Sequence, residues 1–353
     1  MESMSSLPRE EGWFSLSCEF EKWRMKYIDL ESYMVGSVFH YTSALALESI
    51  FRNKTLWVTK SDFLNDKTEY MYGINLVNKL FEKTNYKYLD KNVFAQINRE
   101  FKSYLARSFI FSTSQNSDSV NLWGNYSKYE GYNIGFSLRD IFSRMWDMKI
   151  YVTSNKRYKD GTIKKHYLKR KDQHESIIMF PGEVIYDTVT QENIIVDILT
   201  FLENISQLYY SYARDMDDQN EQIFINLKQH YNIAFGSAIR ILISQIQLFK
   251  NPVFKQDEEY RIIFDVNRKL DVRKYRSFNG VFIPYIEVVF DDINDTKGLP
   301  VESVTIGPKN SLDIAEKGLK LFLKSQGYKI TANPECEYKD RLLIRKSAAP
   351  LRC

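Results

Sequence analysis

The chain has 353 residues, 44% of them hydrophobic and 15% aromatic, which is enough to bury one large core or two ordinary ones and excludes a largely disordered protein. Its 49 basic and 45 acidic residues leave a formal net charge of only +4, which does not by itself indicate nucleic-acid binding. Three scattered cysteines exclude a disulfide framework, and four widely separated histidines lack the spacing of a zinc site, so we expect no metal.

The start of the sequence has no basic segment followed by an apolar run, and every apolar run is interrupted before it reaches 18 residues. A secretory signal and a membrane-spanning helix are therefore not expected. We expect a cytoplasmic protein that has no membrane partner.

Short strands and helices alternate in the first third of the chain. An N-terminal tail and helix are expected over residues 1–36. Asp66 and Glu69 have the spacing of a helix cap, with an acidic residue at the third helical position. The elements predicted after the tail are a strand over 37–42, a helix over 44–52, a strand over 55–59, a helix from about 66 to 83 and a helix over 92–105.

The middle of the chain changes character. Strands are predicted over 107–114 and 132–138, on either side of the segment LWGNYSKYEG. Residues 155–174 hold eight Lys or Arg against two Asp and are predicted to form a basic loop. Residues 189–250 carry two stripes of apolar residues at spacings of three and four, which predicts a long helical hairpin.

Strands return after Pro252 in the segments EYRIIFDV, GVFIPYIEVVF and VESVTIGP, and a helix over 311–324 and a short strand near 340–346 follow them. Because strands lie on both sides of the helical segment, the pattern indicates an α+β fold. We predict a single α+β domain over residues 37–353, with mixed antiparallel sheets, flanking helices and the long hairpin as an insertion.

Four clusters combine residue types that are common in binding sites. Two of them lie early in the chain, and each has a plain structural explanation. His40 could be a core histidine at the end of a strand, and Asp66 with Glu69 could simply cap a helix. The four clusters are His40-Tyr41-Thr42, Asn65-Asp66-x-x-Glu69, Trp123-x-x-Tyr126 and Asp257-Glu258-Glu259-Tyr260-Arg261.

The two later clusters also have plain explanations. Trp123 and Tyr126, three residues apart, are usually a packing pair on a helix. Glu259 and Arg261 alternate with Tyr260, so both could lie on the solvated face of a strand. None of the four clusters indicates an activity when it is considered alone.

Taken in order, the segments HYT, FLNDKTEY, LWGNYSKYEGYNIGFSL, DEEYRIIF and VESVTIGP resemble an uncharacterised bacterial family that includes AbiGi-type abortive-infection proteins. The resemblance spans roughly residues 38–345. Two departures from the family pattern matter. Lys67 stands where the family has a proline, and Asp257 stands where it has the first of two glutamates, which leaves Glu259 as the candidate acid.

That family is in turn similar to the ADP-ribosyltransferase superfamily, including its DNA-modifying toxin branch. The resemblance implies an ADP-ribosyltransferase-like fold and an enzyme that consumes NAD as its substrate, without a metal, in anti-phage defence or as a toxin. Breaking the nicotinamide–ribose bond passes through an oxocarbenium-like state, which a nearby carboxylate stabilises. The resemblance gives this catalytic role to Glu259.

The same resemblance implies that the other motif residues bind NAD. A histidine would bond a ribose hydroxyl, an aromatic ring would stack on nicotinamide, and an arginine would pair with the pyrophosphate. Asparagine or aspartate could bond the amide or the phosphate side. The residues expected to bind NAD are His40, Tyr41, Thr42, Asn65, Asp66, Trp123, Tyr126 and Arg261.

The acceptor of the ADP-ribose group stays open between a nucleic acid and a protein, and plain hydrolysis of NAD fits equally well. The basic residues 155–174 are the one clue in the sequence. They could follow a phosphate backbone, or they could form a solvated loop. The candidate nucleic-acid contacts are Lys164, Lys165, Lys169 and Arg170.

Two other classes of function stay open. A non-catalytic nucleotide-sensing or interaction subunit of a defence system would keep the binding residues but would turn nothing over. A metal-independent nuclease would use His40 and an acid for general acid–base catalysis. The motifs contain no second histidine, which counts against the nuclease.

Overall fold

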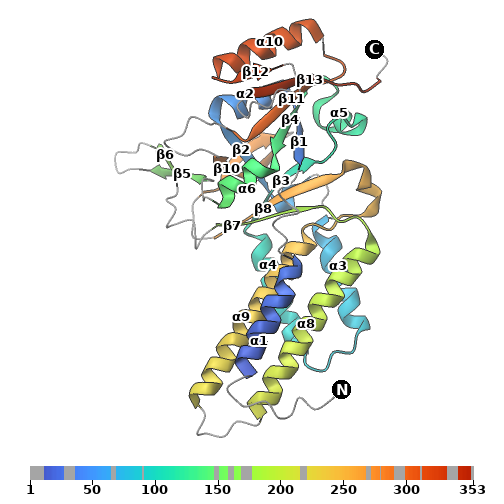
Figure 1. Ribbon diagram of the computed structural model, residues 1–353, viewed down its shortest axis with the longest axis vertical. Coiled ribbons are helices and arrows are strands. Elements are labelled where there is room, and N and C mark those ends of the chain that lie inside the picture. Colours follow the sequence, from blue (N-terminus) through green and yellow to red (C-terminus); the bar gives the residue numbers. More distant parts are fainter. Residues whose placement is uncertain are drawn as a thin grey trace. The chain divides into compact units, whose positions relative to one another are not determined.

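The structure is a computed structural model of the chain, shown in Figure 1. It forms two compact units, each built from three separate segments. The helical unit comprises Met1–Leu30, Asp66–Ala106 and Ile185–Pro252, and the sheet unit comprises the rest. The described residues are 12–27, 36–64, 69–89, 91–146, 151–157, 163–167, 177–214, 221–267, 272–278, 280–289, 299–310, 312–331 and 341–350.

The sheet unit contains the strands, which pair almost entirely in antiparallel fashion. Within the described residues 13 strands join one sheet in the order β12-β13-β11-β4-β1-β3-β2-β10-β5-β6, with β7, β8 and β9 branching from this path. The strands are β1 Ser37–Thr42, β2 Thr55–Lys60, β3 Ser108–Ser114, β4 Tyr132–Ser137, β5 Tyr151–Arg157, β6 Ile163–Tyr167, β7 Ile177–Glu183, β8 Glu259–Val266, β9 Lys274–Phe278, β10 Val281–Val289, β11 Val301–Ile306, β12 Lys329–Thr331 and β13 Arg341–Lys346.

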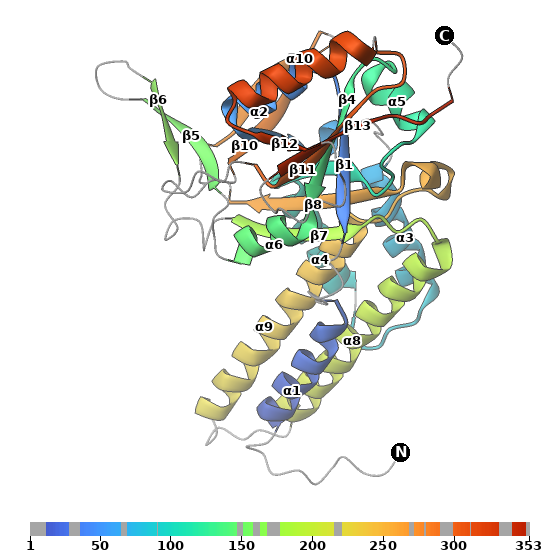
Figure 2. The same ribbon diagram turned by 45° about the horizontal axis from the view of Figure 1, so that its top comes forward.

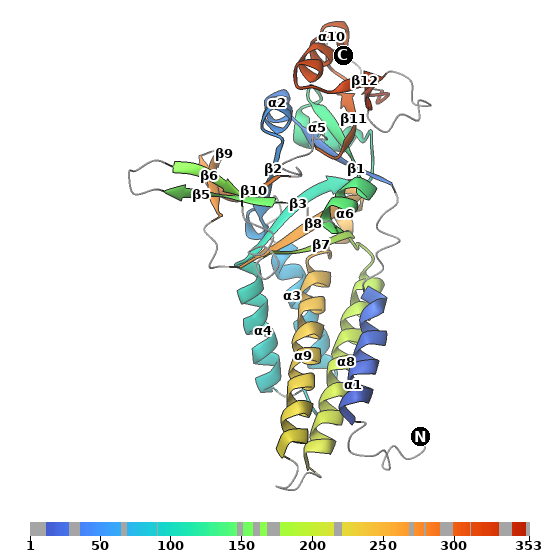
Figure 3. The ribbon, with the colours of Figure 1, turned by 60° about the vertical axis from the view of Figure 1, so that its left-hand side comes forward.

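Strand β3 is the branch point of the sheet. It pairs with β8 over its whole length, from Ser108 opposite Asp265 to Ser114 opposite Glu259. Its other edge pairs with β2 near the start of the strand and with β1 near the end. Figure 3 shows β3, β8 and β7 as neighbours, in agreement with their register. The residues of interest on β1, β3 and β8 are thus brought to adjacent strands.

Among the residues that the structure describes, four α-helices of the sheet unit flank the sheet. The helix α2 begins after Ser43, whose hydroxyl accepts from the Ala46 N–H, and ends at Lys54 in the left-handed conformation. Helices α2 and α10 lie side by side in Figure 2, and buried residues of both join the core of the sheet unit, among them Phe51 and Leu323. These helices are α2 Ala44–Asn53, α5 Val120–Ser127, α6 Leu138–Trp146 and α10 Leu312–Ser325.

The helical unit contains the long hairpin that the sequence predicts over 189–250. Its two helices bury apolar residues at helical spacing, for example Ile198, Leu202 and Ile205. Figure 1 shows α1 alongside α8 and α9. The ends of the hairpin meet, because Ile185 forms a parallel bridge with Phe249. The helices are α1 Gly12–Arg24, α3 Glu69–Lys83, α4 Lys91–Leu105, α8 Thr188–Arg214 and α9 Glu221–Ile246.

The α+β class, the flanking helices and the helical hairpin are thus confirmed. The prediction of a basic loop over 155–174 is wrong in part, because β5 runs to Arg157 and pairs in register with β6. The residues Tyr151, Val152, Thr153 and Ile163 favour extended backbone, and a high content of Lys and Arg does not prevent it. None of the helices in the described ranges is long and apolar enough to cross a bilayer.

Candidate functional site

Two charged side chains at the start of β8 form a buried ion pair. The Arg261 Nε lies 2.8 Å from Glu259 Oε1, and the Arg261 Nη2 donates to Glu259 Oε2 at 3.0 Å. The side chains are only 3% and 8% exposed, respectively. Residues two apart on a strand point to the same face, so the predicted alternation is confirmed. The expectation of a solvated face is wrong, because β8 has β3 on one edge and β7 on the other.

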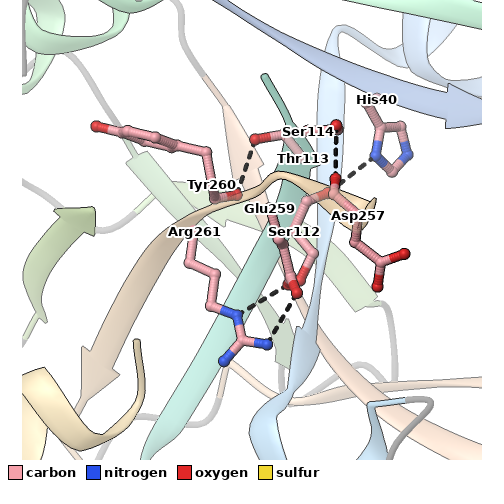
Figure 4. Close-up of polar contacts among 8 residues, drawn as sticks. All are labelled: His40, Ser112, Thr113, Ser114, Asp257, Glu259, Tyr260 and Arg261. Atoms are coloured by element: carbon pink, nitrogen blue, oxygen red, sulfur yellow. Dashed lines mark hydrogen bonds and ion pairs between the residues drawn. The ribbon is translucent and has the colours of Figure 1, made fainter. Parts of the chain in front are cut away.

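The hydroxyl groups at the end of β3 fix the backbone that carries Glu259. The Thr113 Oγ1 donates to the Tyr260 carbonyl at 2.8 Å, and the Ser114 Oγ donates to the Asp257 carbonyl at 2.7 Å (Figure 4). Glu258, between these two acceptors, has a φ of 43° in the left-handed region. A non-glycine residue there stores strain, and such strain is common at functional sites.

Sequence reasoning missed Ser112, Thr113 and Ser114 as site residues. Their signal was a run of three small hydroxyl residues at the end of a strand. That run shows a role only when its partner strands are known. In the structure all three residues pair with β8, and Ser112 and Ser114 also contact β1.

His40 lies on β1 and contacts β3 through its ring. The Nδ1 atom is 3.3 Å from the Ser112 carbonyl oxygen, and the ring packs 5.0 Å from that of Phe111. The pKa of His40 is lowered to about 4, mainly by burial. The hydrogen bond to Ser112 acts in the opposite direction and raises the pKa, whereas the positive charge of Arg276 lowers it further. His40 is therefore neutral at pH 7.

The partner of Nδ1 decides the tautomer of this neutral imidazole. A carbonyl oxygen can only accept, so the proton must sit on Nδ1. The Nε2 atom then carries a lone pair and acts as an acceptor. No hydrogen bond to Nε2 is formed by the part of the chain that the structure describes. His40 therefore has the chemistry needed to accept from a hydroxyl group.

The sheet splits at the place where His40 sits. On one edge of β3, Phe109 and Ile110 pair with β2, and Ser114 pairs with Phe39 of β1. The residues between, 111–113, have no ladder partner on that edge among the described strands. We call residues 111–113 the fork, because β1 and β2 separate there. The His40 imidazole bonds the carbonyl that the fork leaves open.

The register also shows which face each side chain takes. Ser114 lies opposite both Glu259 and Phe39, and opposite partners point to the same face. His40 follows Phe39 and so points to the other face, which agrees with its contact to the Phe111 ring. Glu259 and His40 thus flank β3 from opposite faces, so the register does not bring the candidate acid and the candidate ribose-binding histidine to one face of the sheet.

Tyr41 and Trp123 pack against each other beside the fork. Their rings are 4.8 Å apart in an edge-to-face arrangement, and the Trp123 Nε1 donates to Asp118 at 2.6 Å. The Tyr41 hydroxyl donates to the Asn116 carbonyl and accepts from the Ser119 N–H, each at 2.8 Å. Burial raises the pKa of Tyr41. Both rings therefore hold the segment after β3, which contradicts the expectation that Trp123 offers a face to nicotinamide.

Of the remaining residues expected at the site, some lie within the described residues and others do not. Thr42 is buried on β1, opposite Tyr132, and Tyr126 is 44% exposed. Asn65 and Asp66 lie outside the described residues. Lys164 and Lys165 are on β6 and their side chains are not described, and Lys169 and Arg170 also lie outside the described residues. The described residues hold no group of three or more His, Cys, Asp or Glu that could bind a metal ion.

One comparison with known proteins gives a match. Residues 122–262 match the model of a family described as "Protein of unknown function (DUF2971)". The matched stretch runs from α5 into β8 and contains Trp123, Glu259 and Arg261, but not His40. No curated protein matches the chain. No solved structure matches it. The chain is thus similar to an uncharacterised family over about two fifths of its length.

Proposed function

We propose that the protein is an NAD-consuming enzyme of the ADP-ribosyltransferase type that acts in the cytoplasm, in anti-phage defence or as a toxin. One observation carries the proposal. A neutral histidine with an acceptor nitrogen and a buried carboxylate stand on the two strands that flank β3, beside the fork. Ribose binding needs an acceptor for its hydroxyls, and cleavage of the glycosidic bond needs a negative charge close to the sugar.

In the proposed reaction the bond between ribose C1′ and the nicotinamide nitrogen breaks, and nicotinamide leaves with the electron pair. The sugar gains positive charge in this transition state. The Glu259 carboxylate stabilises that charge, and Arg261 and the strained backbone at Glu258 hold it in place. A nucleophile then bonds to C1′ and loses a proton. It is a nucleic acid or a protein for transfer, and water for hydrolysis.

His40 has a binding role in this proposal. Its Nε2 accepts a hydrogen bond from a ribose hydroxyl, because the Ser112 carbonyl fixes the proton on Nδ1. The fork leaves residues 111–113 without a ladder partner on one edge of β3, and in this proposal the two riboses of a dinucleotide contact His40 and Glu259 on the two faces of the strand.

The test is a measurement of nicotinamide release by purified Glu259→Gln. We expect turnover to fall by about 100-fold or more, because the variant keeps the shape and loses the charge. The matched control is Asp265→Asn. Asp265 lies on the same strand and forms an ion pair with Arg107 at 3.0 Å, away from His40. The control should keep the turnover of the wild-type protein.

The unfolding temperatures of both variants are measured as well, because Glu259→Gln leaves the buried Arg261 without its charged partner and destabilises the sheet unit. Glu259→Asp keeps the charge but shortens the side chain, so it tests the position of the carboxylate in a protein that retains the ion pair. Normal nicotinamide release from folded Glu259→Gln would overturn the proposal.

A non-catalytic nucleotide-sensing or interaction subunit is the second candidate. It is favoured by the engagement of both Glu259 oxygens with Arg261, because this pairing gives the carboxylate a structural partner within the sheet. In this case the wild-type protein binds NAD without releasing nicotinamide, and Glu259→Gln lowers stability but leaves the affinity for NAD unchanged.

A further inference from the structure

Arg276 on β9 is a half-buried cation whose charge has no carboxylate partner in the described part of the chain. Its Nη2 donates to the Thr59 Oγ1 at 2.9 Å. The neighbouring cation on the same face, Lys274, has a different arrangement, because its Nζ lies 2.6 Å from the Glu287 carboxylate. Arg276 therefore keeps a positive charge that the described side chains do not neutralise.

Two aromatic rings hold the Arg276 guanidinium. Its Cζ lies 5.9 Å from the ring centre of Trp57 and 6.0 Å from that of Tyr285, and the two rings are 4.6 Å apart. The Arg276 side chain is half-buried, and this burial lowers the pKa of its guanidinium. The two rings pack on each other and the guanidinium lies beside both of them, so an arginine restrained in this way loses little side-chain entropy when it binds a planar or tetrahedral anion.

The position of Arg276 relates it to the candidate site. Tyr285 lies opposite Thr59, Thr59 lies opposite Ile110, and Ile110 shares a face with Ser114 and Glu259. The hydrogen bond to Thr59 places Arg276 on this same face. Its charge also acts on the His40 imidazole, which lies at the fork. Arg276 is thus on the face of the carboxylate and within electrostatic reach of the histidine.

We propose that Arg276 is the phosphate-binding residue of a nucleotide site next to the fork, with Trp57 and Tyr285 holding its guanidinium in place. The inference rests on the proposed function and adds to it the group that binds the pyrophosphate. The sequence assigns that role to Arg261, but the Arg261 charge is already engaged by Glu259 at 2.8 Å.

The donor geometry of arginine supports this assignment. The guanidinium has five N–H donors, of which Thr59 takes one in this structure. The donors that remain suit two parallel hydrogen bonds to phosphate oxygens. Trp57 is 38% exposed, so part of this residue is accessible to a base or a ribose. The ligand class is therefore a nucleoside diphosphate or a dinucleotide rather than a neutral nucleoside.

The test uses ADP, which contains the pyrophosphate but no nicotinamide, so turnover cannot affect the result. Isothermal titration at low salt compares the wild-type protein with Arg276→Gln, Arg276→Lys and Arg273→Gln. Arg273 is an exposed cation just before β9, so its replacement gives a matched loss of charge. We expect Arg276→Gln to weaken ADP binding by about tenfold or more, and Arg276→Lys to fall between it and the wild-type protein. Arg273→Gln should bind ADP as the wild-type protein does.

Adenosine and inorganic phosphate complete the experiment. If Arg276 binds phosphate, adenosine should bind equally to the wild-type protein and to Arg276→Gln. If the site also binds the nucleoside, inorganic phosphate should bind more weakly than ADP. Equal ADP affinity of wild-type protein and Arg276→Gln overturns the inference, as does an equal loss in Arg273→Gln or the absence of ADP binding by the wild-type protein. Unfolding temperatures identify a variant that fails to fold, and Arg276→Lys then keeps the test decisive.

The result is separable from the test of the proposed function. If the wild-type protein releases no nicotinamide and yet binds ADP through Arg276, the nucleotide site stands and the enzymatic proposal fails. If nicotinamide is released and Arg276→Gln has an unchanged KM for NAD, the enzyme stands and this inference fails.

Discussion

A single backbone carbonyl decides the chemistry of His40. Because the Ser112 oxygen accepts from Nδ1, the imidazole is held in one tautomer and presents Nε2 as an acceptor. Burial lowers the pKa of His40 to about 4, so the ring stays neutral over the physiological range. A protonated ring would donate from both nitrogens and could no longer accept from a hydroxyl group. The proposed binding role of His40 thus depends on its remaining uncharged.

The lowered pKa of His40 predicts a dependence of stability on pH. His40 binds a proton near pH 6.5 in the unfolded chain and near pH 4 in the folded protein. Between these pH values the unfolded state therefore holds more protons than the folded state. The stabilisation is fully present above about pH 6.5 and is lost as the pH falls towards 4, by about 3 kcal/mol in all. Urea unfolding at several pH values should show this loss in the wild-type protein, and in His40→Gln the free energy of unfolding should change less steeply with pH. The same dependence on pH in both proteins would contradict the lowered pKa of His40.

Local sequence allowed some residue-scale predictions and not others. The alternation of Glu259, Tyr260 and Arg261 predicts a shared face for the two charged residues, and this is confirmed. Their burial and their pairing depend on β3 and β7, whose positions in the sequence are far from β8. Arg276 could not be selected at all, because its rings, Trp57 and Tyr285, reach it only through the pairing of β2 with β10.

At the scale of elements, one carboxylate fixes the first helix of the helical unit. Asp197 on α8 accepts from the Trp23 Nε1 at 2.8 Å and from the Tyr27 hydroxyl at 2.6 Å, and Lys26 lies 3.1 Å away. The Trp23 ring also stacks on Phe201, with the ring centres 4.0 Å apart. Burial by itself raises the pKa of Asp197, but the hydrogen bonds from these three residues lower it below its ordinary value.

Replacement of Asp197 should loosen α1. We expect Asp197→Asn to lower the free energy of unfolding by about 1 kcal/mol at pH 7, since the charged acceptor is lost at a site that is partly exposed. The difference should start to shrink as the pH falls below the ordinary pKa of an aspartate, and it should disappear only below the lowered pKa of Asp197 in the folded protein, where the wild-type carboxylate is protonated as well.

The matched control for Asp197→Asn is Glu192→Gln on the same helix. The Glu192 carboxylate lies 3.7 Å from the Lys79 Nζ in an exposed pair, so its removal should cost less than about 0.5 kcal/mol. An equal effect of the two variants in denaturant titrations would show that Asp197 contributes no more than a surface charge.

Helices with a clear periodic spacing of apolar residues could be predicted from the sequence, whereas features that depend on pairing between distant strands could not. The apolar stripes predict the hairpin over 189–250, and α8 and α9 span Thr188–Arg214 and Glu221–Ile246. The fork has no local signal, because it arises from three different partners of β3. The strand β6 was missed for another reason: the charge of its Lys residues outweighed its β-branched and aromatic residues in the interpretation.

At the scale of the whole molecule, the chain passes repeatedly between its two units. Each unit takes three of the six successive segments, so the chain crosses from one to the other five times. The residues at the fork, the Glu259–Arg261 pair and Arg276 all belong to the sheet unit. The sequence predicts the hairpin as an insertion, but it contains no sign that α1, α3 and α4 share a unit with it, because packing between helices leaves no local pattern that identifies the partner.

This division predicts the result of excising the hairpin. The Ile185–Phe249 bridge brings its ends together, so a short Gly-Ser linker can replace residues 187–247. The excision removes the 27 residues of α8 and the 26 of α9. The helices α1, α3 and α4, of 13 to 15 residues each, then lose their packing partners, and isolated helices of that length are marginal in water. The loss of helical signal in far-UV circular dichroism should therefore exceed that of the two excised helices.

Hydrogen exchange should still show protected amides in β4, which lies between β1 and β11 within the sheet unit. A loss of signal equal to the excised helices alone would mean that α1, α3 and α4 hold their structure without the hairpin.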